Sequence, residues 1–477
     1  MKLIILVALI FVISFSTSIR VGFYSANIEG YQYTQSDLLD VFNLFKVING
    51  KKGKDILNVS VMKSNEVKNQ NSDVFKNYDL ILISLQETNA SQDIQLKNMF
   101  MEDKDWQCHP MQYKNGFTKF VPKLTAVAMC NNKTKLKYIF DKTPFIPLGL
   151  FGSVIPTDLK AVFGRCFEDL TSKSKNDVLC FLGGHLETDL INGAKRIGRL
   201  FKFIENKVKN RPYNFYVLGD LNVRNWIKID KDNVDKLKSD FEANKLSSYI
   251  TGDTQAQIGF QSELSKTIDQ KSHFFSFVGN DNLRALPFTY NYHVPKPDTD
   301  VSNFDTKHFR FDCATQYKKA VEGKDVSNYG WLDRLGCGYN KLKGSCNIKG
   351  GDENVNYFMV PFLRKADHMP MIGSFEINSE GTKDEKLDKK DNISLVSSGS
   401  VKDLINKFES IKDGKIESKD LIVDTPITKK LSNSGSISKK SEVKVIEEKG
   451  KIVGKSSLSL DDVKDKKTRK LKVNNIN

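Results

Sequence analysis

Apolar runs alternate with amphipathic stretches through most of the chain. Two of the amphipathic stretches predict helices at Ser36–Val47 and Ser91–Met101, and a third at Gly193–Lys209 has apolar residues at helical spacing. Because strand-like and helical patterns alternate, residues 19–377 are predicted to form one α/β domain. The strand-like runs are Ile19–Tyr24, Leu80–Leu85, Ala126–Cys130, Ala161–Phe167, Val178–Leu182, Phe215–Leu218 and Met371–Phe375.

The two ends of the chain differ from this central part. Lys2, the apolar stretch Leu3–Phe15 and the small residues Ser16–Ser18 predict a secretory signal peptide over residues 1–18, and hence export. A retained membrane anchor is the alternative, but this stretch is shorter than the roughly 20 apolar residues that span a bilayer. Residues 378–477 have Phe408 as their only aromatic residue and are rich in Lys and Ser, which predicts a disordered tail.

Charge and cysteine content indicate the binding partners and the redox compartment of the protein, but they do not identify a substrate. The net charge of +15 favours anionic partners, such as a phosphoinositide-bearing membrane or nucleic acid, but a lysine-rich proteome would explain it equally well. All seven cysteines follow the signal pattern, so in an oxidising compartment some should pair, with at least one left over. Cys166 and Cys180 lie in strand-like runs on either side of the polar turn Thr171–Asn176, which predicts a disulfide across a hairpin.

The stretch Tyr216–Arg224 carries the strongest chemical signal. The apolar run Phe215–Leu218 ends at Gly219, and Asp220 and Asn222 follow it. Side chains two residues apart at a strand end point the same way, so a carboxylate and a carboxamide would share the rim of a sheet. A carboxylate can hold a metal or accept a proton from water, and an amide can donate to a phosphoryl oxygen. A simple turn is the alternative interpretation.

Polar residues follow other predicted strands in the same manner, and their order makes the set specific. Taken alone, each has an ordinary structural explanation: a Glu can cap a helix, a His can form hydrogen bonds within the core, and an Asp-His pair can lie in a loop. In chain order the set is Asn27, Glu87, His185, Asp220, Asn222, Asp333, Asp367 and His368.

This order resembles the endonuclease/exonuclease/phosphatase superfamily, the group of pancreatic deoxyribonuclease and abasic-site endonucleases. The resemblance covers about residues 20–377, and its blocks are Leu85-Gln-Glu87, Gly219-Asp-Leu-Asn222 and Asp367-His-x-Pro370. It implies a four-layer α/β sandwich, in which two packed mixed β-sheets are flanked by helices and the site lies at one edge.

The resemblance also implies Mg²⁺-dependent attack of water on phosphorus, with Mn²⁺ as an alternative ion. Glu87 and Asn27 would hold or orient the metal, which agrees with the preference of Mg²⁺ for oxygen ligands. Asp220 would orient or deprotonate the attacking water, and Asn222 would stabilise the phosphoryl oxygens.

The remaining residues of the set are implied to act on the phosphate side. His368 would contact the scissile phosphate or serve as the base, with Asp333 fixing its tautomer. His185 would be a second phosphate-side group, and Asp367 would lie near the metal or the water.

Within the superfamily, the chain looks most like the inositol polyphosphate 5-phosphatases. The matching blocks are Gly219-Asp-Leu-Asn-Val-Arg224, Trp331-Leu-Asp-Arg-Leu335, Thr289-Tyr-Asn-Tyr292, Phe304-Asp-Thr306 and His185-Leu186. Through these blocks Arg224, Arg334 and Tyr290 are implied to bind a polyphosphorylated ring. Pairing with a neighbouring carboxylate is an equal alternative for Arg334.

Departures from the phosphatase pattern bear on the substrate. Asn291 stands where those enzymes have a Lys that helps to hold neighbouring inositol phosphates, and Lys160 only loosely matches their Asn-Lys-Gly block. By the same resemblance, Asn291 and Lys160 are further candidates for substrate binding. Extra sequence that includes Cys313 separates Asp305 from Trp331. These changes concern substrate binding more than the metal and water chemistry.

The sequence therefore predicts a secreted Mg²⁺-dependent phosphatase of phosphoinositides or inositol polyphosphates. An anionic membrane surface is a candidate partner, and no obligate protein partner is evident. A secreted phosphodiesterase, either deoxyribonuclease-like with nucleic acid as substrate or sphingomyelinase-like, is the alternative. A third hypothesis is a degenerate effector in which Asn291 and the extra sequence mark lost catalysis.

Overall fold

The computed structural model describes ten stretches of the chain: residues 18–50, 71–89, 91–99, 104–112, 124–139, 145–147, 160–172, 176–225, 234–293 and 329–379. The predicted signal peptide 1–18 lies outside them except for Ser18, which begins the first strand, and the predicted tail 378–477 lies outside them except for Asn378 and Ser379, of which Asn378 ends the last strand. The Phe304–Thr306 block and Cys313 also lie outside them. Within these stretches, no helix combines the length and the apolar character that crossing a membrane requires.

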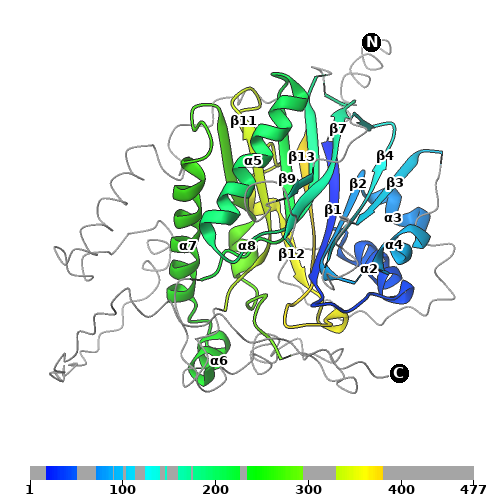
Figure 1. Ribbon diagram of the computed structural model, residues 1–477. Helices are drawn as coiled ribbons and strands as arrows, with labels where there is room; N and C mark the ends of the chain where they lie inside the picture. The colour runs from blue at the N-terminus through cyan, green and yellow to red at the C-terminus, as the bar shows by residue number, and fades with distance from the viewer. Residues whose placement is uncertain are drawn as a thin grey trace, which may run out of the picture. The chain divides into compact units, whose positions relative to one another are not determined.

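Two β-sheets form the centre of the molecule (Figure 1). Sheet A contains, in spatial order, β12 (Asn356–Met359), β13 (Met371–Asn378), β1 (Ser18–Asn27), β2 (Leu80–Thr88), β4 (Leu124–Asn132) and β3 (Trp106–Gln112). Sheet B contains β10 (His273–Val278), β11 (Asp333–Asn340), β9 (Tyr213–Asp220), β8 (Val178–His185), β7 (Ala161–Asp169) and β5 (Leu136–Tyr138), and β6 (Phe145–Pro147) also pairs with β7.

Helices cover the outer faces of both sheets. In Figure 1, α2 (Gln35–Ile48), α3 (Asn71–Asn77) and α4 (Gln92–Met99) lie beside sheet A, and α5 (Leu190–Val208) and α7 (Ser247–Ser265) lie beside sheet B. The shorter elements are α6 (Val234–Glu242), α8 (Asn280–Arg284) and the 3-10 helices η4 (Asp352–Asn354) and η5 (Pro361–Leu363). The predicted four-layer α/β sandwich is thus confirmed.

Alternating side chains of the central strands bury both faces of each sheet. In β1, Phe23 joins the core between the two sheets, and Tyr24 joins the core beneath α2. In β9, Tyr216 and Leu218 face sheet A, while Val217 packs in the core shared with α5 and α7. Strands that are covered on both faces read as continuous apolar runs, which is the pattern that the sequence has here.

Each sheet is mixed, with one parallel pair beside antiparallel neighbours. In sheet A, β1 runs parallel to β2, and Asn27 lies opposite Gln86. In sheet B, β8 runs parallel to β9 with His185 opposite Asp220, and antiparallel β11 places Asp333 opposite Asp220. Carboxyl ends of parallel strands meet at one edge of a sheet, so the polar residues that follow these strands lie together.

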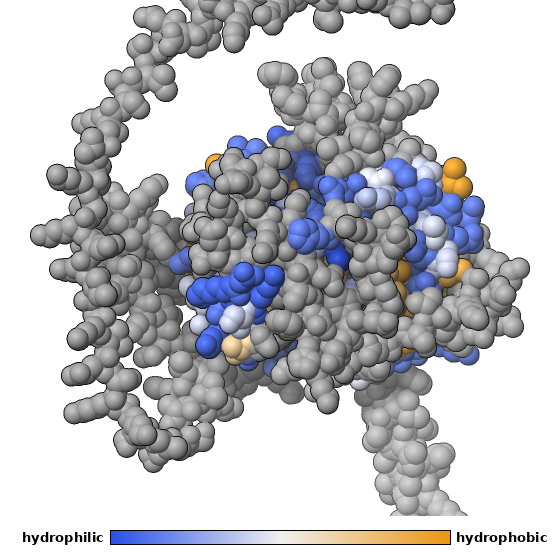
Figure 2. All heavy atoms as spheres, turned by 90° about the horizontal axis from the view of Figure 1, so that it is seen from below, coloured by the Kyte–Doolittle hydropathy of each residue, from blue (hydrophilic) through white to orange (hydrophobic). Residues whose placement is uncertain are grey.

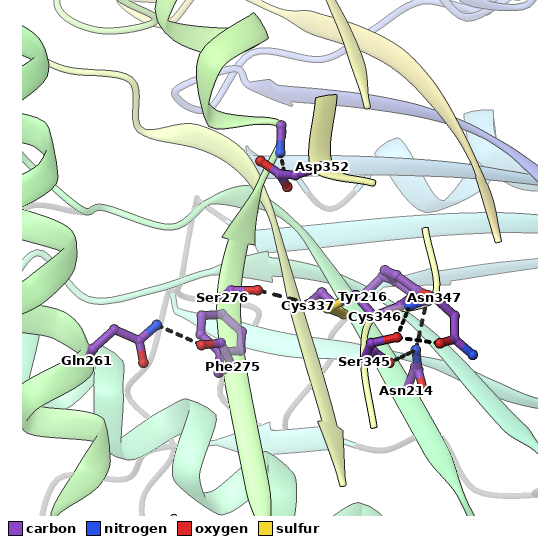
Figure 3. Close-up of a disulfide and its surroundings, with 11 residues drawn as sticks. Asn214, Tyr216, Gln261, Phe275, Ser276, Cys337, Ser345, Cys346, Asn347 and Asp352 are labelled. Atoms are coloured by element: carbon purple, nitrogen blue, oxygen red, sulfur yellow. Dashed lines mark hydrogen bonds between the residues drawn. A yellow bond between two sulfur atoms is a disulfide. The ribbon is translucent and has the colours of Figure 1, made fainter. Parts of the chain in front are cut away.

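Six of the seven cysteines form three disulfides within the described stretches. The predicted Cys166–Cys180 bond is confirmed, and it joins residues directly opposite each other in β7 and β8. The other two bonds are Cys108–Cys130, between β3 and β4, and Cys337–Cys346. Figure 3 shows the latter beside Tyr216, whose hydroxyl donates to the Cys346 carbonyl at 2.6 Å.

All seven predicted strands and all three predicted helices exist, although their bounds shift. The sequence pattern did not indicate ten of the described helices and strands. They are β3, β5, β6, β10, β11, β12, α3, α6, α7 and α8.

Candidate active site

The candidate site lies where the ends of β1 and β2 meet the ends of β8 and β9. Asn27 from sheet A donates from Nδ2 to Oδ2 of Asp220 from sheet B at 3.2 Å, which joins the two sheets at their shared edge. Both side chains are almost fully buried, at 4% and 2% exposure. The sequence pattern predicted that these residues follow strands, and the packing of the two sheets brings them into contact.

Glu87 reaches the same edge through an irregular backbone. The pairing of β2 with β4 shifts register between Leu85 and Thr88, which is a bulge, and Glu87 has a φ of 54°. A bulge re-aims the side chain that it carries. A left-handed conformation costs about 1 kcal/mol or more for a residue such as Glu and persists only where the surroundings hold it. Here the backbone carbonyl of Glu87 accepts a bond from the Gly30 amide, which ties the bulge to the loop after β1.

His185 and Lys160 lie between Glu87 and Asp220. His185 Nε2 is 3.2 Å from Asp220 Oδ2 and 3.7 Å from Glu87 Oε1. Lys160, directly before β7, contacts His185 Nε2, and its Nζ is 3.8 Å from Glu87 Oε1. Burial and the Lys160 charge lower the pKa of His185. Burial also lowers the pKa of Lys160, although Asp220 and Glu87 oppose this.

His368 completes the surroundings of Asp220 from the other side. Its Nδ1 is 2.8 Å from Asp333 Oδ2, and its Nε2 is 3.7 Å from Asp220 Oδ2 and 4.0 Å from Asp367 Oδ1. Burial acts to lower the pKa of His368, but the charges of Asp333, Asp220 and Asp367 outweigh burial and raise it to about 9. The imidazole is therefore protonated at neutral pH.

Opposite charges also determine the protonation of Asp220. Burial acts to raise its pKa, but His368, His185 and Lys160 together hold the pKa of this carboxyl well below its ordinary value. The site thus contains an ionised carboxylate facing a protonated imidazole.

Asn222 and Arg224 extend the cluster toward Tyr290. Asn222, with a φ of 52°, donates from Nδ2 to the Leu186 carbonyl at 2.8 Å, and its Oδ1 accepts from Arg224 Nη2 at 3.2 Å. The guanidinium lies 4.8 Å from the centre of the Tyr290 ring, and that ring lies 4.6 Å from the His368 ring. Cation–π contact at this distance is favourable and fixes the plane of the guanidinium. Arg224, Tyr290 and His368 therefore form one continuous wall.

Arg334 does not reach this cluster, and the substrate contact expected for it is not supported. Its side chain is 1% exposed and donates to Asp253 Oδ1 at 2.7 Å and to the Trp331 carbonyl at 2.6 Å. The alternative, pairing with a carboxylate, is what the structure contains. The missed partner is Asp253, since α7 was not predicted.

Asn291 lies beside the cluster but is buried, at 4% exposure. Its neighbour Tyr292 bonds through its amide to the Asp367 carbonyl at 2.9 Å. A role not foreseen from the sequence belongs to Thr289, whose hydroxyl accepts from the amides of Leu332 and Asp333 at 2.8 and 3.1 Å. It positions Asp333, and the Thr289–Tyr292 block contained the signal for it.

The donor atoms at this edge fit a hard divalent cation. Among the described residues, no three His, Cys, Asp or Glu side chains form a ligand cluster. Mg²⁺, however, is usually held by only one or two carboxylates together with water and substrate oxygens. The Glu87 carboxylate, 17% exposed, and the Asn27 amide oxygen, which accepts one bond from the Glu29 amide at 3.2 Å, supply oxygen donors of this kind.

The face around this edge is polar. Figure 1 shows the loop from β1 to α2 at the bottom of the view, and Figure 2 looks at the molecule from below. The described residues seen on that face are mostly hydrophilic, with small separate hydrophobic groups.

Fold and cluster together define a two-sheet α/β sandwich with an acid–imidazole site at the shared sheet edge. No family model matches the sequence, and a search of curated proteins finds no match. The solved structures to which the chain is similar include members of the superfamily that the sequence resembles.

One of them is the inositol polyphosphate 5-phosphatase domain of SpSynaptojanin, in complex with inositol (1,4)-bisphosphate and a calcium ion. It matches at 13% identity and a TM-score of 0.41, and the match covers 84% of this chain and 93% of that chain. An endonuclease/exonuclease/phosphatase from Bacteroides vulgatus matches at 12% identity and a TM-score of 0.34, over 76% and 99%. A Cimex nitrophorin in its ferrous NO complex matches at 12% identity and a TM-score of 0.39, over 76% and 99%. Because these TM-scores and identities are low, the description of the fold rests on the strand order of the chain itself.

Proposed function

We propose that the protein is a metal-assisted phosphoric ester hydrolase, and that it removes the 5-phosphate from phosphoinositides or inositol polyphosphates. The observation that carries this proposal is the position of the Asp220 carboxylate. It lies 3.2 Å from a ring nitrogen of His185, 3.7 Å from one of His368 and 3.2 Å from the Asn27 amide. Hydrolysis by water needs a carboxylate that can orient the water and hydrogen-bond donors that can stabilise the phosphoryl oxygens. Asp220 and the groups around it provide both.

In this proposal Asp220 orients the attacking water through its carboxylate. The protonated His368 donates to a phosphoryl oxygen and stabilises the charge that develops on it. Asp333 holds the ring of His368 through Nδ1, so that Nε2 is the nitrogen presented to the substrate. His185 is a second donor beside Asp220.

Glu87 and Asn27 would hold the divalent cation, for which Mg²⁺ is proposed and Mn²⁺ is the alternative. When bound, such an ion supplies Lewis-acid polarisation of a phosphoryl oxygen. The chain's own residues would supply the ligand oxygens, and Asn27 would do so from a buried position.

The preference for a polyphosphorylated ring rests on Arg224. Its guanidinium is fixed by Asn222 and Tyr290 on the wall that also contains His368. A planar cation held in this way suits bidentate contact with a second phosphate group.

The disulfides support the secreted location that the N-terminal pattern predicts. Three disulfides within the described stretches favour an oxidising environment, where such bonds persist. We therefore propose that the enzyme is secreted through a signal peptide over residues 1–18 and encounters anionic membrane surfaces outside the cell that makes it.

The alternative is a secreted phosphodiesterase that cleaves nucleic acid or a phosphodiester lipid. The net charge of +15 favours it because binding to a nucleic acid backbone is largely electrostatic. The Arg224–Tyr290 wall favours the phosphatase.

One experiment compares the two. The purified chain is incubated with Mg²⁺ and either a 5-phosphorylated inositide or supercoiled plasmid, and released phosphate and nicked DNA are measured. We expect phosphate release by the wild type and by Asp269→Asn, an exposed control, and its loss in Asp220→Asn. Nicking without phosphate release would favour the phosphodiesterase. If neither product forms, the 5-phosphatase and the nuclease assignments both fail.

A further inference from the structure

Lys160 supplies a positive charge at the point where the proposed metal ligands lie. It directly precedes β7, and the pairing of Ala161 with His185 places it beside the end of β8. Its Nζ contacts His185 Nε2 and is 3.8 Å from Glu87 Oε1. The side chain is only 22% exposed, so the ammonium is directed into the site rather than into solvent.

The charges around Lys160 explain why it is held there. Glu87 and Asp220 bring two carboxylates to one small volume, with His185 between them at 3.7 and 3.2 Å. Two neighbouring carboxylates repel each other strongly in a partly buried site unless a cation lies close to them. The Lys160 ammonium neutralises part of this charge within the folded chain itself.

A divalent ion on Glu87 would meet this ammonium at close range. Like charges a few ångströms apart in a partly buried site repel strongly, and screening by solvent is weak where exposure is low. The carboxylate oxygen that faces Lys160, Oε1, is one of the two oxygens through which Glu87 would hold the metal. The ammonium and the metal therefore compete for one negative charge.

We propose that Lys160 is a built-in cation of this site, which competes with a divalent metal for Glu87 and must move away before the metal binds. The inference rests on the proposed function only in taking Glu87 and Asn27 as the metal ligands. If the proposal is correct, Lys160 limits the metal affinity of this chain. A variant with an uncharged residue in place of Lys160 should then bind the metal more tightly than the wild type does.

The test measures Mn²⁺ binding directly and needs no hydrolysis. Full-length wild type, Lys160→Met and Lys160→Arg are titrated with Mn²⁺ alone, and the free ion is followed by its electron paramagnetic resonance signal. We expect Lys160→Met to bind Mn²⁺ about tenfold or more tightly than wild type, because one repelling charge is removed. Lys160→Arg, which keeps the charge, should stay near wild type.

Two further variants make the result specific. Lys135→Met removes a comparable ion pair, between Lys135 Nζ and Asp79 Oδ1 at 2.9 Å, at the opposite end of the strands, and it should leave Mn²⁺ affinity unchanged. Glu87→Gln added to Lys160→Met should abolish the gain. Thermal unfolding checks that each variant is folded, and Lys160→Gln replaces Lys160→Met if the latter is not.

Equal or weaker Mn²⁺ binding by the folded neutral variant, including the absence of binding by both proteins, overturns the proposal. A gain that survives Glu87→Gln overturns it as well, since the competition would then not be for Glu87. Because the readout is binding, failure of the phosphatase assay leaves this result intact. Likewise, loss of this inference leaves the phosphatase proposal standing.

Discussion

Replacing His368 by glutamine should change how the stability of the protein depends on pH. In the wild type, Nδ1 of this ring is 2.8 Å from Asp333 Oδ2, and Nε2 is 3.7 Å from Asp220 Oδ2. Burial acts to lower the pKa of the ring, but these carboxylates outweigh burial and raise the pKa of His368 to about 9. Glutamine keeps a polar side chain at this position and cannot titrate.

The sign and size of the effect follow from linkage. An unfolded histidine has a pKa of about 6.5, so between pH 6.5 and 9 the folded chain holds a proton that the unfolded chain has released. The stabilisation from His368 is therefore complete below pH 6.5 and is lost as the pH rises to 9. A raised pKa of this size corresponds to about 3 kcal/mol over that interval.

Urea unfolding followed by tryptophan fluorescence, at a series of pH values from 6 to 9.5, measures this difference. The free energy of unfolding of the wild type should fall by up to about 3 kcal/mol more than that of His368→Gln as the pH rises, because glutamine has no proton to lose in this interval. Parallel curves for the two proteins would refute the assignment of a protonated His368.

Three other substitutions test separate parts of the structure. Arg224→Met should raise KM for a polyphosphorylated inositide roughly tenfold, as expected for one lost charge-assisted contact, with a smaller change in kcat in steady-state assays. Asp253→Ala leaves Arg334 buried without its carboxylate partner and should lower the free energy of unfolding by about 3–5 kcal/mol in urea titrations. Replacing Cys166 and Cys180 together by alanine should cost about 3 kcal/mol without reductant, and wild type and variant should converge when reductant is added.

Much of the site could be predicted because its residues follow strands that bury both faces. The apolar run before Asp220 marks β9, and that before Glu87 marks β2, so a polar residue at either end stands out from the pattern. The bulge at Glu87 and the contact of Asn27 with Asp220 could not be predicted, because both depend on how strands distant in sequence pair and pack. The sequence pattern therefore indicated the members of the site, and the sheets determine their contacts.

The sequence left two roles open for Arg334, and it could not choose carboxylate pairing because the partner, Asp253, lies on a helix that the pattern does not reveal. The buried face of α7 includes Gly252 and Asp253 besides Tyr249 and Phe260, so its apolar stripe is interrupted. Asp253 is buried because it pairs with Arg334, and polar residues at core positions weaken the periodic signal. The buried Arg334–Asp253 ion pair therefore explains why the helix was not predicted and why substrate binding stayed open as a role for Arg334.

The Cys108–Cys130 bond escaped prediction for a related reason. Its first cysteine lies in β3, which contains Pro110 and lacks an apolar run. Proline is tolerated on edge strands because no neighbour needs its missing amide, and β3 is the edge strand of sheet A. The position at the edge therefore explains both the unusual sequence and the missed pairing.

The electrostatics of the site favour one of the roles that the sequence left open for Asp220 and for His368. A carboxylate whose pKa is held well below its ordinary value is a weak proton acceptor, so we infer that Asp220 orients the attacking water rather than removing its proton in advance. A histidine whose pKa is raised to about 9 is mainly protonated at neutral pH, and in that form it can donate to a phosphoryl oxygen. The same close approach of His368 and Asp220 produces both shifts. Catalysis in the proposed reaction would therefore depend on the stabilisation of charge on the phosphoryl group more than on general-base activation of the water.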